Sequence, residues 1–337
     1  MLTRRLWGKR LAAAGLAAAL PVSAFGRPET GLSAGLPVRG DIWPVHDPCI
    51  IRADGLYHLF CTSQMRQGRG LIAWRTSPDL VTWTLKGSVM PAFPDWVMRA
   101  VPGARGAWAP DISYENGRYR LYYAASTFGT NGSVIGLMTT PTLDTARPDF
   151  AWRDDGLVMA SGPGDDFNAI DPNLVRDAQG GQWLVLGSFW SGLKMTRLDA
   201  ASGKPIDATA LVAVAERPQK PDAVEGAFLI RHGEDYYLFA SYDFCCRGVN
   251  SSYYTVVGRS RSVTGPFVDR DGASMLEGGG TVVLSASEHW KGPGHCAVLQ
   301  DMDADYIVYH AYDADNGGRP TLRINRLDWR DGWPVVG

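Results

Sequence analysis

The sequence predicts an all-β chain folded as a five-bladed β-propeller, and three observations support this. Short runs rich in tyrosine, phenylalanine, valine and isoleucine alternate with glycine, asparagine and aspartate turns, a pattern typical of β-hairpins. No amphipathic helix of useful length follows the first 26 residues. A short marker also recurs five times. It consists of an acidic residue or a histidine between apolar residues, followed by a strand that contains an aromatic residue. The five markers are Asp47, Asp111, Asp171, Glu225 and His295.

The spacing of the markers indicates how the units are arranged. Successive markers are 64, 60, 54 and 70 residues apart, which suits four strands plus loops in each unit. One such sheet cannot bury both of its faces, so the units must pack on one another around an axis. We therefore expect the first strand of each unit to be innermost and its first residues to face the central funnel.

Strand pairs can be assigned along the chain. Asp54-Gly55 and Asn116-Gly117 are strong hairpin signals. Trp83, Trp152 and Trp329 mark expected outer strands. The expected inner pairs are 50–52 with 56–61, 112–114 with 119–124, and 229–231 with 236–241; later strands are expected at 70–75, 133–139, 192–198, 254–260 and 321–327.

The N-terminus has the pattern of a signal peptide at residues 1–26. Four basic residues between Arg4 and Arg10 precede the apolar run 11–22, and both a Sec and a twin-arginine signal are compatible with this start. The run is shorter than the roughly 20 residues that span a bilayer, so we expect no membrane attachment after cleavage. The prediction is a secreted or periplasmic protein with an N-terminal extension at 27–40 and one propeller domain at 41–337.

Composition narrows the class of partner. The chain has 33 basic and 35 acidic residues, so there is no overall field to attract nucleic acid or anionic membranes. Its 12 tryptophans, 13 tyrosines and 11 phenylalanines exceed what five repeat cores need, and aromatic faces commonly bind neutral sugar rings. Core packing is the alternative for most of them. We expect a monomer that acts on a neutral polysaccharide or oligosaccharide.

The five cysteines leave two questions of pairing. Cys245 and Cys246 are adjacent, and either a disulfide that closes a small ring or two free thiols is compatible with the sequence. Cys49, Cys61 and Cys296 lie on expected strands, where we predict buried, inert thiols.

Aligning the units sharpens the set of candidate residues. Matching Pro48 with Pro110 places Ala109, rather than Asp111, at the position of Asp47. The second unit therefore offers no carboxylate there. Three carboxylates and one histidine, which are Asp47, Asp171, Glu225 and His295, remain around the mouth of the funnel.

Clustered carboxylates suit glycoside hydrolysis. Mutual repulsion and desolvation separate their pKa values, and hydrolysis needs one acid to protonate the leaving oxygen and one base to activate water. Glu225 is the expected acid, because its side chain is longer and its frame is apolar. Asp47 is the expected base, and Asp171 would lie between them and orient the acid. A turn-capping role is the alternative for each carboxylate alone, and their recurrence at equivalent points argues against it.

At these residues the sequence resembles glycoside hydrolase family 43, and within it the α-L-arabinanases. The resemblance covers nearly all of the chain after residue 45 and implies a five-bladed propeller with an inverting mechanism. It implies Asp47 as base, Asp171 as pKa modulator and Glu225 as acid, with acid and base about 6.5 to 9.5 Å apart. The motifs, in order, include His46-Asp47-Pro48, Trp108-Ala109-Pro110-Asp111, Asn168-Ala169-Ile170-Asp171-Pro172, Val224-Glu225-Gly226, Phe244-Cys245-Cys246-Arg247, Gly294-His295 and His310-Ala311-Tyr312.

The same resemblance implies further site residues. His295 would lie on the propeller axis, where arabinanases often hold a calcium ion largely through waters. Calcium prefers oxygen ligands, so a histidine bonded to Asp47 or to water is the alternative. The resemblance also implies contacts with sugar, for which structural packing is the alternative: aromatic contacts from Trp108, Phe128 and Trp190, and polar contacts from Asn168 and Ser188.

The expected function is an exported endo-arabinanase that cleaves α-1,5-L-arabinofuranosidic bonds in arabinan with inversion. Endo-acting relatives carry the segment 244–247, which favours internal cleavage. An exo-acting arabinanase, an α-L-arabinofuranosidase or a β-xylosidase is the alternative within the fold. A carbohydrate-binding propeller without catalysis is the alternative of another class. One departure from the family is the run Gly226-Ala227 after the acid, where Ala-Pro or a similar pair is usual.

Overall fold

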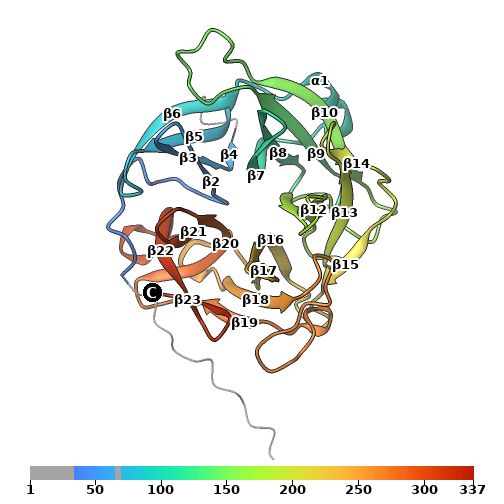
Figure 1. Ribbon diagram of the computed structural model, residues 1–337, viewed down its shortest axis with the longest axis vertical. Helices are drawn as coiled ribbons and strands as arrows, with labels where there is room; N and C mark the ends of the chain where they lie inside the picture. The colour runs from blue at the N-terminus through green and yellow to red at the C-terminus, as the bar shows by residue number, and fades with distance from the viewer. Residues whose placement is uncertain (1–33, 65–69) are drawn as a thin grey trace, which may run out of the picture.

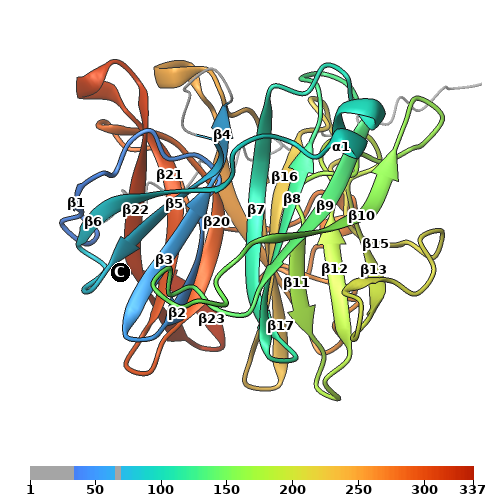
Figure 2. The ribbon, with the colours of Figure 1, turned by 90° about the horizontal axis from the view of Figure 1, so that it is seen from above.

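Five antiparallel sheets surround a central axis in the computed structural model, which describes residues 34–64 and 70–337. The fold is the predicted five-bladed propeller (Figure 1). Apart from the two-residue strands at 39–40 and 63–64, each blade starts at the axis and its later strands lie progressively outward, because each hairpin places a strand beside the one before it. The strands run along the axis (Figure 2). The predicted signal peptide lies outside the described residues.

The blades have the following strands. Blade one contains β1 (Arg39–Gly40), β2 (Cys49–Ala53), β3 (Leu56–Cys61), β5 (Leu71–Ser77) and β6 (Thr82–Met90); blade two contains β4 (Ser63–Gln64), β7 (Gly106–Glu115), β8 (Arg118–Ala125), β9 (Ser133–Thr140) and β10 (Arg153–Ser161); blade three contains β11 (Asn173–Arg176), β12 (Gln182–Leu186), β13 (Leu193–Asp199), β14 (Lys204–Pro205) and β15 (Val212–Ala215). Blade four contains β16 (Val224–His232), β17 (Asp235–Tyr242), β18 (Tyr254–Ser260) and β19 (Thr281–Leu284); blade five contains β20 (Trp290–Gln300), β21 (Asp305–Asp313), β22 (Arg319–Arg330) and β23 (Trp333–Val336). The helix α1 (Asp95–Ala100) connects blades one and two.

The predicted inner strand pairs are confirmed, whereas one of the tryptophan markers is wrong. Trp83 lies in the outer strand β6, and Trp152 directly precedes the outer strand β10. Trp329, however, lies one residue before the end of the third strand β22, and the outer strand is β23. The reason is a contact between blades: the Trp329 ring stacks on His232 of blade four at 3.7 Å between centroids, and its indole N–H donates to Asp305 at 2.7 Å.

Neighbouring blades share apolar cores. Phe60 and Trp74 of blade one pack with Trp152 of blade two, and Phe239 of blade four packs with Tyr309 of blade five. Each large apolar side chain buried in this way stabilises the fold by about 1.5 to 3 kcal/mol. The packing holds the blades together and so fixes the positions of the innermost strands relative to one another.

Residues 34–45 close the ring between blades five and one. Leu36 donates its N–H to Ile324 O at 2.8 Å, and Leu322 donates to Ile42 O at 2.9 Å, so the segment is hydrogen-bonded to β22. On its other side, β1 pairs in parallel with β6. The predicted boundary at residue 41 falls inside this segment, which belongs to the propeller on both sides of that boundary.

No helix within the described parts of the chain is long and apolar enough to cross a bilayer.

Candidate active site

Each blade has one residue with a left-handed backbone just before or within its innermost strand. The φ angles are 51° at Asp47, 41° at Ala109, 55° at Asp171, 61° at Gly226 and 46° at His295. In blades two, four and five the strand register shifts at this point, so that two residues of the innermost strand lie opposite one residue of the next. Such a β-bulge bends the strand and redirects its side chains. The five positions are therefore structurally equivalent.

This equivalence confirms one alignment and corrects another. Ala109 is the counterpart of Asp47, as predicted. In blade four the counterpart is Gly226, so Glu225 stands one residue before the position of the other markers and matches His46 instead. A Cβ on Gly226 would lie 3.1 Å from the His295 ring, and φ is positive there, so this position favours glycine. The acid and the base thus come from different strand positions.

Asp47 is buried, and three side chains from two blades hold it. Its Oδ2 accepts the Thr62 hydroxyl at 2.6 Å, while its Oδ1 lies 2.8 Å from His46 Nδ1 and 3.2 Å from His295 Nδ1. Burial alone would raise the pKa of Asp47, but the imidazoles of His46 and His295 outweigh it and hold the pKa well below its usual range. Asp47 is therefore ionised and can accept a proton.

Blade two helps to hold Asp47 through Thr62, although it has no carboxylate at the equivalent position. The backbone N–H of Ala109 donates to the Thr62 hydroxyl oxygen at 2.8 Å. With that oxygen occupied as an acceptor, the hydroxyl proton of Thr62 is directed at Asp47. The bulge at Ala109 thus helps to orient the Asp47 carboxylate.

Asp171 interacts electrostatically with both Asp47 and Glu225. Its Oδ2 accepts the Gly226 N–H at 3.0 Å and lies 4.0 Å from His295 Nδ1. Burial, followed by the charges of Glu225 and Asp47, raises the pKa of Asp171 well above its usual value. Asp171 therefore retains a proton at a pH where Asp47 is ionised.

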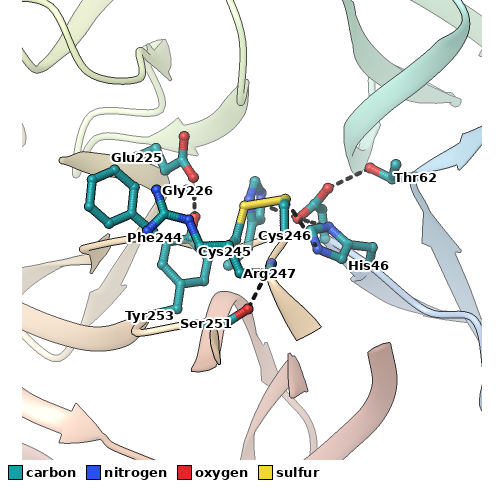
Figure 3. The surroundings of a disulfide bond; sticks show 12 residues. His46, Thr62, Glu225, Gly226, Phe244, Cys245, Cys246, Arg247, Ser251 and Tyr253 are labelled. Atoms are coloured by element: carbon teal, nitrogen blue, oxygen red, sulfur yellow. Dashed lines mark hydrogen bonds and ion pairs between the residues drawn. A yellow bond between two sulfur atoms is a disulfide. The ribbon is translucent and has the colours of Figure 1, made fainter. Parts of the chain in front are cut away.

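Glu225 is half-buried, and a hydroxyl donates to each of its carboxylate oxygens. Ser188 donates to Oε2 at 2.6 Å. Tyr253 donates to Oε1 at 2.6 Å (Figure 3). Burial, together with the charges of Glu225 and Asp171, raises the pKa of the Tyr253 phenol well above its usual value, so the phenol remains a donor. Both hydroxyls stabilise the ionised form of the Glu225 carboxyl.

His295 lies at the same centre as a neutral ring. Burial lowers its pKa, more than the charges of Asp47 and Glu225 raise it. Its backbone N–H donates to Ser241 at 2.8 Å. Its Nδ1 lies 3.2 Å from Asp47 Oδ1, so His295 contacts the carboxylate directly.

The predicted sugar contacts fall into two groups. Phe128 is 82% exposed and Trp190 is 41% exposed, on the loops after β8 and β12, while Trp108 is half-buried immediately before its bulge. Ser188 donates to Glu225, and Asn168 is buried and accepts the Ser133 hydroxyl at 2.6 Å. The aromatic rings are thus available to a ligand, whereas the two polar residues are bonded within the protein. Their contacts with sugar stay predictions.

Sequence reasoning missed several residues that contact Asp47, Glu225 or a partner of Asp47. His46 adjoins Asp47 in the marker itself, and Tyr312 belongs to a quoted motif, yet neither had been given a role. Thr62 and Tyr253 carry no spacing signal. The cysteine question is settled: Cys245 and Cys246 form a disulfide, and the other three cysteines are free and buried as predicted.

The family model of glycosyl hydrolases family 43 matches residues 43–334. The chain belongs to this family. Members similar to it include the extracellular endo-α-(1→5)-L-arabinanase 1 of Bacillus subtilis, which is 42% identical over 86% of this chain and 87% of its own. The crystal structure of an exo-1,5-α-L-arabinanase from a bovine ruminal metagenomic library is 44% identical over 87% of this chain and 96% of its own, with a TM-score of 0.82.

A third member of family 43 has been solved with a ligand. The α-L-arabinanase of Cellvibrio cellulosa, complexed with arabinohexaose, is 38% identical over 87% of this chain and 95% of its own, with a TM-score of 0.82. The site in this chain combines an ionised carboxylate, a carboxyl that keeps its proton and a glutamate with two hydroxyl donors. This combination can supply a base and an acid to one bond.

Proposed function

We propose that the protein is an endo-acting enzyme that hydrolyses α-1,5-L-arabinofuranosidic bonds in arabinan with inversion. The observation that carries this proposal is the unequal environment of the three carboxylates. Asp47 has imidazole and hydroxyl partners, and Glu225 has two hydroxyl donors. The substrate follows from the relatives, which are named arabinanases and are similar over most of their length.

In the proposed mechanism, hydrolysis takes place in one displacement. Asp47 removes a proton from a water molecule as that water attacks the anomeric carbon. Glu225 donates its proton to the departing sugar oxygen, and Ser188 and Tyr253 stabilise the carboxylate that results. Asp171, which keeps its own proton, limits the negative charge beside Glu225. Because water attacks from the face opposite the leaving group, the anomeric configuration inverts.

Calcium at His295 is a separate proposal. The carboxylate oxygens near His295 are engaged, since Asp47 bonds His46 and Thr62 and Asp171 accepts the Gly226 N–H. Calcium prefers oxygen ligands, and with these carboxylates engaged the oxygens would come from water molecules. One His295 nitrogen would then be the direct protein ligand. Such an ion would supply positive charge near Asp47. Removal with a strong chelator is expected to lower both Tm and kcat, and no change in either would contradict the proposal.

Export is also a proposal. The basic residues Arg4 to Arg10 and the apolar run after them support it, and two relatives are named extracellular. Expression of the full chain in a bacterial host should place the activity outside the cytoplasm. Activity confined to the cytoplasmic fraction would contradict export.

The main test follows the products formed from linear and branched arabinan. Long oligomers at early times are expected and indicate endo-action, whereas arabinose or a single short product alone would indicate exo-action. Proton NMR of the first product should show the inverted anomer. If an aryl arabinofuranoside or aryl xyloside is cleaved and arabinan is not, the enzyme is an arabinofuranosidase or a β-xylosidase.

Two substitutions test the residue roles. Glu225→Gln and Asp47→Ala are each expected to lower kcat on arabinan by about 10²- to 10⁴-fold, because each removes a proton-transfer group. The Tm of each variant, measured in parallel, controls for misfolding. Turnover near that of the wild type in either folded variant would refute its assignment.

A further inference from the structure

We propose that the Cys245–Cys246 disulfide positions the general base Asp47 through Tyr312 and His46. The proposal rests on the proposed function, because it takes Asp47 as the base. The disulfide lies in the loop 243–253, which joins β17 to β18. In Figure 3 it stands between Glu225 on one side and His46 and Thr62 on the other. Tyr253, near the end of the same loop, contacts the acid.

The loop is held in one conformation by its own contacts. Ser252 and Tyr253 both donate their N–H groups to Phe244 O, at 2.9 and 3.1 Å. Arg247 donates its N–H to the Ser251 hydroxyl at 3.0 Å, and its guanidinium lies over the Phe244 ring at 4.0 Å. At the tip, the bond between adjacent cysteines closes a small covalent ring that restricts rotation at both residues, and Cys246 has a φ of 66°. The direction of the Cys246 N–H is therefore fixed.

Two glycines of blade five leave the space that the loop occupies. A Cβ on Gly318 would lie 2.7 Å from Val249 N, and a Cβ on Gly292 would lie 2.6 Å from Ser251 Cβ. Contacts this close show that the loop backbone packs directly against β20 and the turn before β22. The loop cannot move toward blade five without a collision.

A chain of hydrogen bonds runs from the disulfide to the base. The Cys246 N–H donates to the Tyr312 phenol oxygen at 2.7 Å, and that phenol lies 2.7 Å from His46 Nε2. His46 Nδ1 lies 2.8 Å from Asp47 Oδ1. Burial raises the pKa of the Tyr312 phenol, so the phenol keeps its proton. The chain connects residues that are far apart in sequence and come from blades one, four and five.

This series of hydrogen bonds orients His46 in either protonation state. An ionised Asp47 can only accept, so His46 Nδ1 must carry a proton and donate it. In the neutral imidazole, Nε2 accepts from Tyr312; in the imidazolium, Nε2 donates to Tyr312. Stacking on His310, at 3.8 Å between centroids, fixes the plane of the His46 ring. His46 and Tyr312 are thus positioning residues, and the fixed Cys246 N–H anchors the far end.

Loss of the disulfide should therefore act on the chemical step. Without the covalent ring, the Cys246 N–H can turn away from Tyr312, and His46 loses its fixed orientation. Asp47 then loses an oriented donor, and the attacking water is held less accurately. A displacement of about 1 Å in such a group can lower the rate by about 10²-fold. A disulfide that only contacts sugar would instead change KM.

The first experiment uses the variant Cys245→Ser/Cys246→Ser and the variant Tyr312→Phe on arabino-oligosaccharides. Each is expected to lower kcat by about 10- to 100-fold with little change in KM. Both variants interrupt the same series of hydrogen bonds. The triple variant that combines them should therefore have a kcat no lower than that of the slower of the two variants, whereas independent effects on kcat would multiply. Tyr309→Phe is the matched control, since Tyr309 lies in the same strand but its hydroxyl bonds Asn325 at 2.9 Å and no catalytic residue.

The second experiment keeps the wild-type sequence and so avoids a folding defect. A water-soluble phosphine converts the disulfide to two thiols, with water supplying the two protons and the oxygen of the phosphine oxide. Cys246 is exposed, so reduction should lower kcat of the folded wild type and leave the double serine variant unaffected. Reduction is confirmed by thiol counting and folding by Tm.

The outcomes separate the two proposals. Wild-type kcat in the folded double serine variant, or fully multiplicative effects in the triple variant, would overturn the positioning role. A rise in KM with unchanged kcat would also overturn it and would make the disulfide a sugar contact. A wild type that cleaves no arabinan would instead refute the proposed function, whatever the variants do.

Discussion

Asp47 and Asp171 are both buried, yet their pKa values move in opposite directions. Burial raises both, but Asp47 faces the imidazoles of His46 and His295, whereas Asp171 faces the carboxylates of Glu225 and Asp47. The neighbours, rather than the residue type, therefore decide which carboxyl is ionised. This difference at the scale of single residues is what permits one to serve as a base while the other retains a proton.

A third buried carboxyl, Asp111, leads to a prediction about pH and stability. It accepts the Leu174 N–H at 2.8 Å and the Asn173 amide at 3.1 Å, and burial raises its pKa to about 7. The folded state therefore holds this proton more tightly than the unfolded state. The resulting stability is complete below about pH 4 and is lost as the pH rises through about 7.

The measurement compares wild type with Asp111→Asn. The free energy of unfolding of the wild type, minus that of the variant, should fall by up to about 4 kcal/mol between pH 4 and 8, since each pH unit contributes about 1.4 kcal/mol. Subtracting the variant removes the titration of the other groups. A difference that stays constant with pH would contradict the raised pKa of Asp111.

Among the structural elements, the left-handed residue just before or within each innermost strand positions the site residues. Such a residue recurs in all five blades as Asp47, Ala109, Asp171, Gly226 and His295, and in blades two, four and five a β-bulge accompanies it. The same left-handed backbone thus presents the proposed base, a small residue, the proposed modulating carboxyl, a glycine and a histidine. In blade four the glycine gives space to His295 and shifts the acid to the preceding residue.

Replacement of Gly226 by alanine should damage this arrangement. The new Cβ would lie 3.1 Å from the His295 ring, at a φ of 61°, so His295 must move away and its contact with Asp47 changes. We expect kcat to fall by about 10²-fold. The matched control is Gly233→Ala, where φ is 62° and no atom lies within 4 Å of the new Cβ. Equal activity loss in both variants would show that backbone strain alone is responsible.

Across the whole molecule, the segment 34–45 determines how the ring closes. It bonds β22 of blade five and β6 of blade one, so it covers the junction between the first and last blades. In a propeller each blade contacts only its neighbours, and an unsealed junction would leave two blade faces exposed to water. The junction lies beside His46 and Asp47, because Val45 donates its N–H to Pro320 O at 2.9 Å.

Removal of residues 1–42 should therefore lower stability more than removal of residues 1–33. The longer deletion loses the apolar contacts of Leu36 and Ile42 and several backbone hydrogen bonds, each worth about 1 kcal/mol. We expect Tm to fall by about 5 to 10 °C relative to the shorter deletion. Equal Tm values for the two chains, measured by calorimetry, would refute the role of this segment in closure.

The sequence by itself determined the five blades, most strand pairs and the three carboxylates. Turn residues, alternating strands and a repeated marker are local signals, and each can be recognised without knowing what lies across the molecule. The tertiary structure alone decided which side chains act on the acid and the base. His46 and Tyr312 are 266 residues apart, and Tyr253 reaches Glu225 from a loop between two other strands. It also decided the pairing of Cys245 with Cys246 and the offset of Glu225 from the bulge. These features depend on strand register and loop path between neighbouring blades, and no local pattern encodes a contact that forms only when the ring closes.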